Sequence, residues 1–237
     1  MSVVNMLATG DLDTDVADAR AKAEEGFAAM KIKVGGKPVA DDIARTQAIG
    51  EALAGAVQLS ADANQGWKRD DAITYARGAS AALDFLEQPV MGRDVEGMAM
   101  VAGEAACALA ADEGLHSFED VRRHHAMGAA KGGSVKMIKL GGVTRAFQAT
   151  ELFAELGMNV NLAGKTAETS VSSAAVVHLA SAAPVLAWGV SPTTPYLAVD
   201  IARNPITVRE GHVEAPTGAG LGVEVDEDAL ARYARPS

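Results

Sequence analysis

Three carboxylates follow short apolar segments at equal intervals in this chain of 237 residues. Asp62, Glu87 and Asp112 stand 25 residues apart in each step, the length of one strand-and-helix unit. Carboxylates gathered at one point resist ionisation unless a cation neutralises them. Oxygen ligands with no cysteine or histidine beside them suit Mg²⁺, which keeps open positions for substrate or water. The spacing therefore predicts a magnesium site, although any one of these residues alone is more often a helix cap or a solvated strand end.

Three lysines flank the carboxylates. Lys31 and Lys33 are two residues apart on a predicted strand, so both side chains point to one face. Repulsion between the two ammonium groups is expected to lower both pKa values and to favour a free amine near neutral pH. Lys136 follows Asp112 by 24 residues, which places it across the site from Lys33 with the metal between them. Lysines on two sides of a bound substrate can remove or return a proton on either face, whereas exposure on a sheet edge is the alternative.

The elements that must position these side chains alternate along the whole chain. Short apolar runs are separated by longer, alanine-rich segments with scattered charges, which predicts strands and helices in alternation and hence a parallel sheet. Eight strands favour an α/β fold of the (β/α)8-type TIM barrel, in a (β/α)7β variant, over an open doubly wound sheet. The predicted strands are 3–7, 30–34, 57–62, 85–87, 108–111, 135–138, 160–162 and 185–188. The predicted helices are 14–25, 41–53, 71–82, 95–104, 117–125, 143–156 and 169–182.

The C-terminal part of the chain has a different character. After Pro192 the sequence is rich in turn-forming residues, so we expect a single barrel domain over 1–237, with the barrel at about 1–192 and a C-terminal extension at about 193–237. The Gly-x-Gly-x-Gly at 218–222 resembles a phosphate loop. No strand-then-helix context surrounds it, and a turn is the preferred interpretation.

Composition excludes several classes of protein. Hydrophobic residues make up 49 % of the chain, which indicates a folded domain, and 31 acidic against 21 basic residues give a formal charge of −10. This charge argues against nucleic acid or an anionic membrane as a partner. A lone cysteine, Cys107, cannot form an internal disulfide. With no visible signal peptide or membrane span, we expect a cytoplasmic protein.

Five motifs then carry a family resemblance that covers nearly the whole chain. They are Lys-x-Lys at 31–33, Asp-Ala-Asn-Gln-Gly-Trp at 62–67, Phe-Leu-Glu-Gln-Pro at 85–89, Ala-Asp-Glu at 111–113 and Lys-x₄-Gly-Gly at 136–142. In this order they resemble the enolase superfamily, and within it the muconate-lactonising subgroup (muconate cycloisomerase and mandelate racemase-like barrels). The resemblance implies Mg²⁺-dependent removal of a proton α to a carboxylate through an enediolate intermediate. It also implies a small carboxylate substrate and a homo-oligomer.

The resemblance assigns roles by position. Lys33 becomes one acid/base, Lys31 its neighbour and partner to the substrate carboxylate, and Lys136 the residue on the opposite face. Lys139 is the competitor of Lys136, although strand alternation would turn it to the other face. The implied Mg²⁺ ligands are Asp62, Glu87 and Asp112.

Three further residues match the family as supporting groups. Asn64 and Glu113 resemble residues that support the metal ligands and Lys136 through neighbouring contacts. Glu168 matches an acidic position of the lactonising subgroup, but an acid in the first turn of a helix is an equally good interpretation.

Two motifs of related enzymes are absent from this sequence, which narrows the choice of reaction. The mandelate-racemase branch uses a histidine after the seventh strand, and 159–162 contains none; the five histidines are expected on the surface or in packing. Dipeptide epimerases carry Asp-x-Asp after the eighth strand, where this chain has Ala-Trp-Gly-Val-Ser-Pro at 187–192. We therefore predict a muconate-type cycloisomerase, with a racemase, epimerase or dehydratase acting on an amino-acid or hydroxy-acid derivative as the alternative.

The family also has an N-terminal lid domain that covers the barrel mouth. This sequence begins at the first barrel strand, so we expect the capping domain to be absent. A lidless, catalytically inactive barrel is therefore a second hypothesis. A phosphate-binding barrel is the third, but 191–195 lacks the glycine loop and helix N-terminus that it needs.

Overall fold

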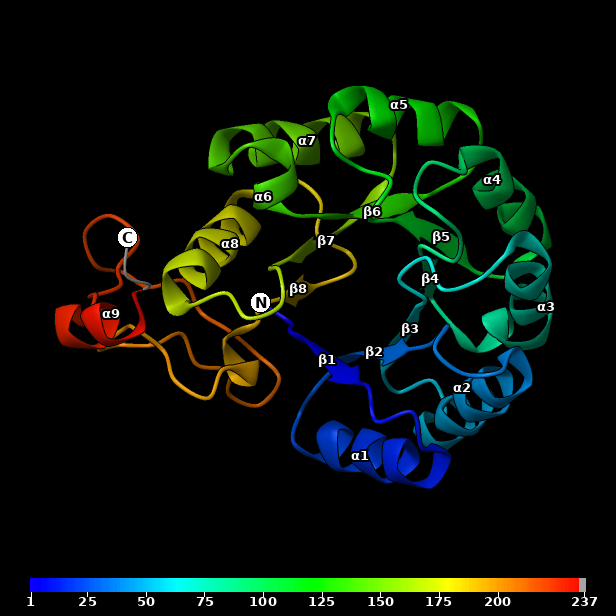
Figure 1. The fold of residues 1–237 in the computed structure, drawn as a ribbon, viewed down its shortest axis with the longest axis horizontal. Helices are drawn as coiled ribbons and strands as arrows, with labels where there is room; N and C mark the ends of the chain where they lie inside the picture. The colour runs from blue at the N-terminus through cyan, green and yellow to red at the C-terminus, as the bar shows by residue number, and fades with distance from the viewer. Residues whose placement is uncertain (235–237) are drawn as a thin grey trace.

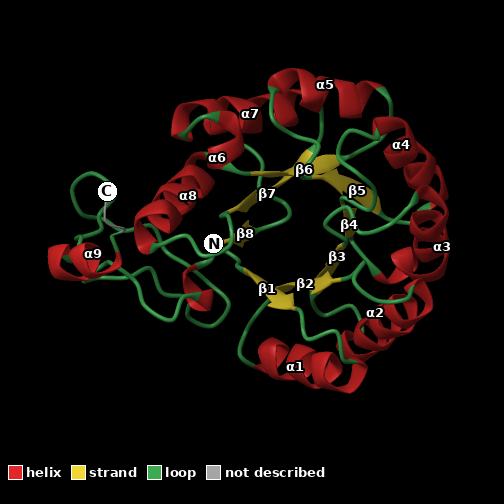
Figure 2. Cartoon of the chain, in the orientation of Figure 1, coloured by secondary structure: helices red, strands yellow, loops and turns green. Residues whose placement is uncertain are grey.

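Eight parallel strands follow one another in the order β1 to β8 in the computed structural model, which describes residues 1–234 (Figures 1 and 2). The ring closes where Val3 forms a parallel bridge with Val190, whose amide donates to the Ser2 carbonyl oxygen at 3.1 Å. This closure confirms the predicted TIM-type barrel and excludes an open doubly wound sheet. The strands are β1 (Val4–Leu7), β2 (Ala29–Lys33), β3 (Gln58–Asp62), β4 (Phe85–Glu87), β5 (Ala108–Ala111), β6 (Gly132–Val135), β7 (Asn159–Ala163) and β8 (Val190–Ser191).

A helix follows each of the first seven strands and covers the outside of the ring (Figure 2). These helices are α1 (Leu12–Glu24), α2 (Val39–Leu53), α3 (Arg69–Ala79), α4 (Val95–Glu104), α5 (Phe118–Ala126), α7 (Val143–Glu155) and α8 (Ser170–Ala182). A 3-10 turn, η1 (Ser80–Ala82), extends α3, and the short helix α6 (Met137–Leu140) precedes α7. After β8 the described chain continues into η2 (Thr194–Tyr196) and α9 (Glu227–Tyr233) rather than an eighth barrel helix, as the (β/α)7β variant predicts.

The predicted helices lie within three residues of the observed ones, and side-chain caps mark the starts of some of them. The Asp11 carboxylate accepts a hydrogen bond from the Thr14 amide at 2.9 Å and begins α1. The Ser117 hydroxyl accepts one from the Asp120 amide at 3.1 Å and begins α5. Helix α2 ends at Ala54, whose φ of 48° is left-handed. The Asp11 and Ser117 caps satisfy backbone groups that a helix terminus leaves unpaired, so they can be read from the sequence, whereas a left-handed alanine cannot.

Strand β2 shows how the barrel separates apolar from charged side chains. Met30 and Ile32 are fully buried in the main hydrophobic core. Lys31 and Lys33 alternate with them and line a cavity at the barrel mouth. Because successive side chains of a strand point to opposite faces, two apolar residues on one face send two lysines to the other.

Two strands lie elsewhere than predicted. The sixth is Gly132–Val135 rather than 135–138, and the eighth is Val190–Ser191 rather than 185–188. Glycine is depleted in strands, so Gly132 does not signal one. In the barrel, however, a Cβ on Gly132 would lie only 2.3 Å from Cζ3 of Trp188, which stacks on Phe85 with ring centroids 4.2 Å apart. The apolar run before β8 therefore supplies a ring that fills the barrel interior, and β6 needs glycine beside it.

The residues after Pro192 pack on the side of the barrel where the eighth helix would lie (Figure 1). The Gly211 carbonyl oxygen accepts a hydrogen bond from the Val3 amide at 2.8 Å. The Asp200 carboxylate accepts one from the Ser170 hydroxyl at 2.7 Å, at the start of α8. The extension thus ties the first strand and α8 together.

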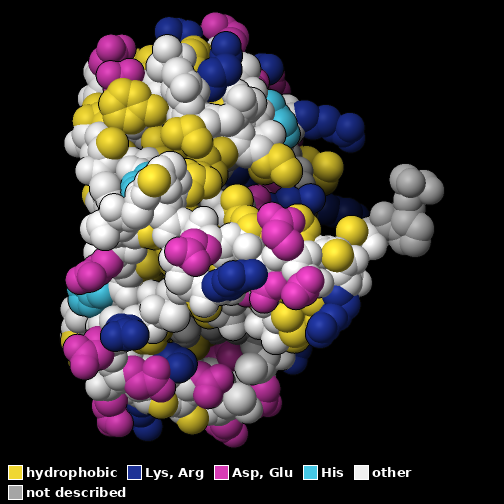
Figure 3. All heavy atoms as spheres, turned by 90° about the vertical axis from the view of Figure 1, so that its left-hand side faces the viewer, with side chains coloured by type: hydrophobic (Ala, Val, Ile, Leu, Met, Phe, Trp, Pro, Cys, Tyr) yellow, Lys and Arg dark blue, Asp and Glu magenta, His cyan; other side chains and the backbone are white. Residues whose placement is uncertain are grey.

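On the face of the molecule that Figure 3 shows, hydrophobic and charged side chains gather in different regions. Figure 3 shows hydrophobic side chains gathered in its upper half, where Figure 1 has α6, α7 and α8, and mostly charged side chains in its lower half.

Among the residues that the structure describes, no helix is both long and apolar enough to cross a membrane. The expected homo-oligomer stays a prediction.

Candidate active site

A cavity of about 640 Å³ opens at the mouth of the barrel. Its lining contains five of the six predicted catalytic and metal-binding residues: Lys31, Lys33, Asp62, Glu87 and Lys136. They come from the carboxyl ends of β2, β3 and β4 and from the residue after β6. Because parallel strands end at the same rim of a barrel, residues from distant parts of the sequence meet there.

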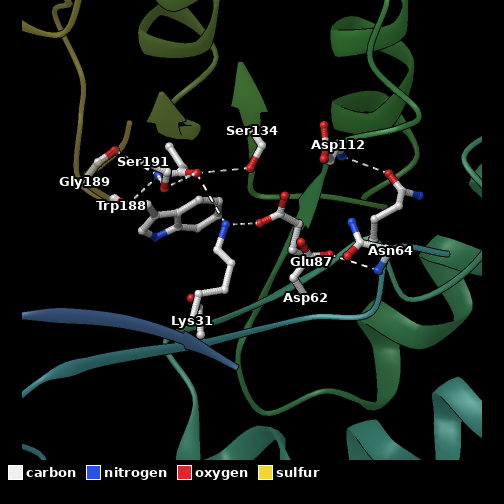
Figure 4. Close-up of polar contacts among 12 residues, drawn as sticks. Lys31, Asp62, Asn64, Glu87, Asp112, Ser134, Trp188, Gly189 and Ser191 are labelled. Atoms are coloured by element: carbon white, nitrogen blue, oxygen red, sulfur yellow. Dashed lines mark hydrogen bonds and ion pairs between the residues drawn. The ribbon is translucent and has the colours of Figure 1, made fainter. Parts of the chain in front are cut away.

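Lys31 lies in the barrel interior, where its ammonium group pairs with the Glu87 carboxylate (Figure 4). Asn161 Oδ1 lies 3.4 Å from the same Nζ. The carbonyl oxygens of Trp188 and Gly189 orient this amide, each accepting a hydrogen bond from Asn161 Nδ2 at 3.0 Å. Burial opposes a charge on Lys31, but the carboxylates, Glu87 foremost, outweigh it and raise the pKa of Lys31. The predicted lowering of this pKa by the second lysine is therefore wrong.

Lys33 sits nearer the solvent and contacts two predicted site residues. Its Nζ lies 2.5 Å from Asp62 Oδ2 and 2.8 Å from Asn64 Oδ1. Asn64 has a left-handed φ of 44°, and its amide donates to Asp62 Oδ1 at 2.9 Å. Its side chain also donates to Glu113 Oε1 at 3.1 Å. Asn64 thus joins Lys33 to Glu113. Glu113 was expected to support Lys136, but the hydrogen bond that its side chain accepts comes from Asn64.

Asp112 receives two lysines rather than one. Lys136 Nζ lies 2.5 Å from its Oδ2, and Lys139 Nζ lies 2.6 Å from its Oδ1. The expectation that Lys139 faces away is wrong, because the chain after Lys136 is helical and α6 turns Lys139 toward Asp112. Burial opposes a positive charge on both amines. For Lys136 the nearby Asp112 carboxylate outweighs burial and raises the pKa. For Lys139 burial prevails over Asp112 and lowers the pKa. The two lysines that compete for the role therefore differ electrostatically.

Gln88 is a supporting residue that the sequence analysis missed. It is buried, has a left-handed φ of 37°, and its Oε1 accepts hydrogen bonds from the amides of Asp112 at 2.8 Å and Gly114 at 3.1 Å. It therefore ties the end of β4 to the end of β5. A glutamine directly after a site carboxylate, in Glu87-Gln88, was the available signal.

The three carboxylates Asp62, Glu87 and Asp112 (the carboxylate trio) do not lie at the same level of the strand ladder. Asp62 pairs with Glu87 in the strand ladder, whereas the partner of Glu87 on β5 is Ala110, and Asp112 lies two residues further on. Within residues 1–234, no group of three or more His, Cys, Asp or Glu side chains is arranged to hold a metal ion. Each carboxylate of the trio instead bonds a lysine. Equal spacing in sequence therefore gives carboxylates at different levels of the strand ladder, each paired with a lysine, and the three as Mg²⁺ ligands stay a prediction.

The chemistry of this donor set nevertheless fits Mg²⁺. All three carboxylates are buried and offer only oxygen, the ligand that this cation prefers. Burial, together with nearby Asp62 and Asp112, raises the pKa of Glu87, although Lys31 opposes this. The three negative charges thus lie close enough to require positive charge between them.

Glu168 is not part of the mouth cavity. It lines a neighbouring groove with Ile138 and Val143, and its Oε2 accepts a hydrogen bond from the Ser172 hydroxyl at 2.9 Å in the first turn of α8. The mouth cavity instead includes Lys165 and Tyr196, which the sequence analysis missed. Lys165 follows the seventh strand as the carboxylates follow earlier ones, so the same positional rule would have found it.

His124 is buried beneath the loop that carries Asp112. Its Nδ1 lies 2.8 Å from the Asp120 carbonyl oxygen, and its Nε2 has no hydrogen-bond partner among the described residues. Burial lowers the pKa of His124, although Asp120 opposes this and Arg123 adds to it. The histidine is thus a packing residue, as predicted.

This burial predicts a pH-dependent stability. The unfolded chain takes up a proton on His124 near pH 6.5, whereas the folded chain takes it up only at lower pH. Stability is therefore complete above about pH 6.5 and falls as the pH drops below it, by up to about 1.4 kcal/mol per pH unit. Urea unfolding of the protein and of His124→Leu between pH 7.5 and 5 checks this. An equal loss of stability in both proteins would contradict the assignment.

Comparison with known proteins shows the family to which the chain belongs. The family model described as enolase C-terminal domain-like matches residues 14–229, so the chain belongs to that family. A chloromuconate cycloisomerase of Cupriavidus pinatubonensis is 33 % identical over 240 residues, covering 100 % of this chain and 64 % of the relative. An N-succinyl-L-Arg/Lys racemase of Bacillus cereus is 29 % identical over 231 residues, covering 96 % and 61 %. These relatives are isomerases of the enolase superfamily.

Solved structures give the same result. The muconate cycloisomerase of Pseudomonas fluorescens superposes with a TM-score of 0.93 at 26 % identity, covering 100 % of this chain and 66 % of that chain. The present chain thus spans somewhat less than two thirds of the length of the proteins that it matches.

Proposed function

We propose that this chain forms the catalytic barrel of a Mg²⁺-dependent enzyme that removes a proton from the carbon next to a carboxylate, in a muconate-type cycloisomerisation. One observation carries the proposal: Lys33 and Lys136 line a single cavity, and each contacts a different carboxylate of the trio. The names of the chloromuconate and muconate cycloisomerases that the chain resembles support the same reaction.

The residues of the mouth have separate tasks in this reaction. The three carboxylates would hold Mg²⁺, whose chemistry when bound is to neutralise the substrate carboxylate and the charge that develops as the proton leaves. Lys31, kept protonated by Glu87, donates hydrogen bonds to the substrate carboxylate. Lys33 accepts or returns the proton on one face of the substrate, and Lys136 acts on the other.

A racemase or epimerase is the second candidate. A racemase needs a base on each face of the same carbon, and lysines on two sides of the cavity meet that need. The N-succinyl-L-Arg/Lys racemase among the relatives supports this reading. The fold alone does not choose between the two reactions.

Incubation in D₂O with a panel of carboxylates tests the chemistry that both candidates share. The panel holds muconates and their lactones, N-succinyl amino acids of both configurations, and proline derivatives. We expect deuterium to enter the carbon next to the carboxylate in at least one member, with Mg²⁺ and not with chelator, as detected by mass spectrometry. A net change to a lactone identifies a cycloisomerase, and loss of optical activity identifies a racemase.

The opposite result has an equally clear meaning. If calorimetry detects Mg²⁺ binding to the folded chain but no member of the panel takes up deuterium, the proposed activity is wrong for this chain. A catalytically inactive barrel is then the better description. If deuterium enters equally with chelator, the proposed role of Mg²⁺ is wrong.

A further inference from the structure

Three charged residues form a buried cluster behind the barrel wall, outside the mouth cavity. Arg45 on α2 donates to Asp15 on α1 at 2.6 Å and to Asp42, one helical turn before it, at 3.0 Å. The three residues are exposed by 3 %, 0 % and 1 %, respectively. Neither the metal site nor the proton-transfer residues described above include them.

The cluster holds the backbone on both sides of the end of β2. One Arg45 nitrogen, Nη2, donates a hydrogen bond to the carbonyl oxygen of Lys33. The Asp42 carboxylate accepts a hydrogen bond from the Gly35 amide at 2.8 Å. One ion-paired unit thus binds the residue that carries the catalytic amine and the second residue after it.

The same unit holds the loop after β1. Asp15 accepts hydrogen bonds from the Thr9 hydroxyl at 2.7 Å and from the Gly10 amide at 3.3 Å. The chain leaving β2 is also confined on its other side, since a Cβ on Gly35, which has a φ of +85°, would lie 2.8 Å from the Ala63 carbonyl oxygen. The end of β2 is therefore held between the cluster and the loop that carries Asn64.

Stability alone is a weak reason for this arrangement. Removing three charged groups from water is unfavourable, and apolar residues of similar volume often give an equally stable fold. The planar guanidinium, by contrast, presents several donors in fixed directions, so it fixes the groups around it in both position and orientation. Such a device suits a strand end whose side chain must meet its target accurately.

We propose that Arg45 is a positioning residue for Lys33, acting through the Lys33 carbonyl and, by way of Asp42, the Gly35 amide. The inference rests on the proposed function, in which Lys33 transfers a proton. Displacing a reacting group by about 1 Å lowers a rate by roughly 10²-fold. Loss of the cluster should therefore impair Lys33 much more than Lys136, which lies on the far side of the barrel.

The test compares two variants with a control. Arg45→Met removes the guanidinium, and Asp15→Asn/Asp42→Asn/Arg45→Met leaves no unpaired buried charge if the single variant folds poorly. Phe153→Leu, at a fully buried position on α7, supplies a core defect far from β2. Hydrogen–deuterium exchange of the peptide 30–36 is measured in all of them. Deuterium uptake is then measured for both enantiomers of the most reactive chiral carboxylate, with Lys33→Met and Lys136→Met defining which amine serves which enantiomer.

We expect both cluster variants to lose protection in the peptide 30–36 and to exchange the Lys33-dependent enantiomer about 10²-fold more slowly. The Lys136-dependent enantiomer should change no more than it does in Phe153→Leu. Equal losses for both enantiomers, or full protection of the peptide 30–36, would overturn the inference. If the unchanged protein exchanges no carboxylate, the proposed function fails, and the peptide measurement alone decides whether the cluster holds Lys33.

Discussion

Replacing Lys136 by alanine should lower Mg²⁺-dependent deuterium uptake by about 10²- to 10⁴-fold, the contribution usual for a positioned acid or base. Lys136 Nζ lies 2.5 Å from Asp112 and lines the mouth cavity opposite Lys33. Its loss removes the base of one face but leaves all three carboxylates in place. Mg²⁺ affinity, measured by calorimetry, should therefore be equal or higher, because one competing ammonium group has gone.

Lys139→Ala is the matched control, since both lysines contact the Asp112 carboxylate. Lys139 also donates to the Asp112 carbonyl oxygen at 2.5 Å and is absent from the lining of the mouth cavity. We expect Lys139→Ala to keep most of the exchange activity. Loss of activity in Lys139→Ala with retention in Lys136→Ala would reverse the two roles. Loss of Mg²⁺ binding in Lys136→Ala would contradict its assignment as an acid/base.

Glu87→Gln should have the largest combined effect on stability and on metal binding. It leaves Lys31 as a buried ammonium group without its carboxylate, and breaking a buried pair in this way costs about 3–5 kcal/mol. It also removes one carboxylate of the trio. Mutation of a residue that only hydrogen-bonds to a metal ligand typically lowers metal affinity by roughly 10- to 100-fold. Because Glu87 is itself a proposed ligand, the loss of Mg²⁺ affinity should be larger. Urea unfolding without metal and calorimetry with Mg²⁺ measure the two effects separately.

A double variant separates these two consequences. In Lys31→Met/Glu87→Gln no buried charge is left unpaired, so the free energy of unfolding should return toward that of the unchanged protein. Mg²⁺ affinity should stay low, because the carboxylate is still missing. Lys31→Met alone should cost less than Glu87→Gln, since burial and nearby carboxylates already raise the pKa of Glu87 and let it become neutral. A Glu87→Gln protein as stable as the original would show that Lys31 is not a charged partner of Glu87.

The barrel itself could be predicted from the sequence because its signals are local. The Asp11 and Ser117 caps and the alternation of strands with helices mark element boundaries without knowledge of the tertiary fold. The strands that were misplaced, β6 and β8, depend on packing across the barrel. Gly132 belongs to a strand because Trp188, 56 positions later in the chain, fills the space beside it. No pattern within either segment contains that information.

The candidate site divides in the same way. Regular spacing correctly placed five of six predicted residues at one cavity. The pairing of Lys33 with Asp62 was not predicted and depends on the register of two adjacent strands. The spacing did not reveal that Asp112 lies two residues beyond the strand partner of Glu87. It also did not reveal that helix α6 brings Lys139 to Asp112. Nor did it indicate that Glu168 lies in a separate groove.

By itself, the sequence determined the fold class, the order of the elements and five of the residues that line the barrel mouth, because periodicity, caps and motif spacing act within one strand-and-helix unit. Only the tertiary structure decided which lysine meets which carboxylate, how the pKa values of Lys31 and Lys139 shift, and that Arg45 binds the backbone of Lys33. These properties depend on distances between units and on burial. Both are created only when the barrel closes and excludes water from the groups inside it.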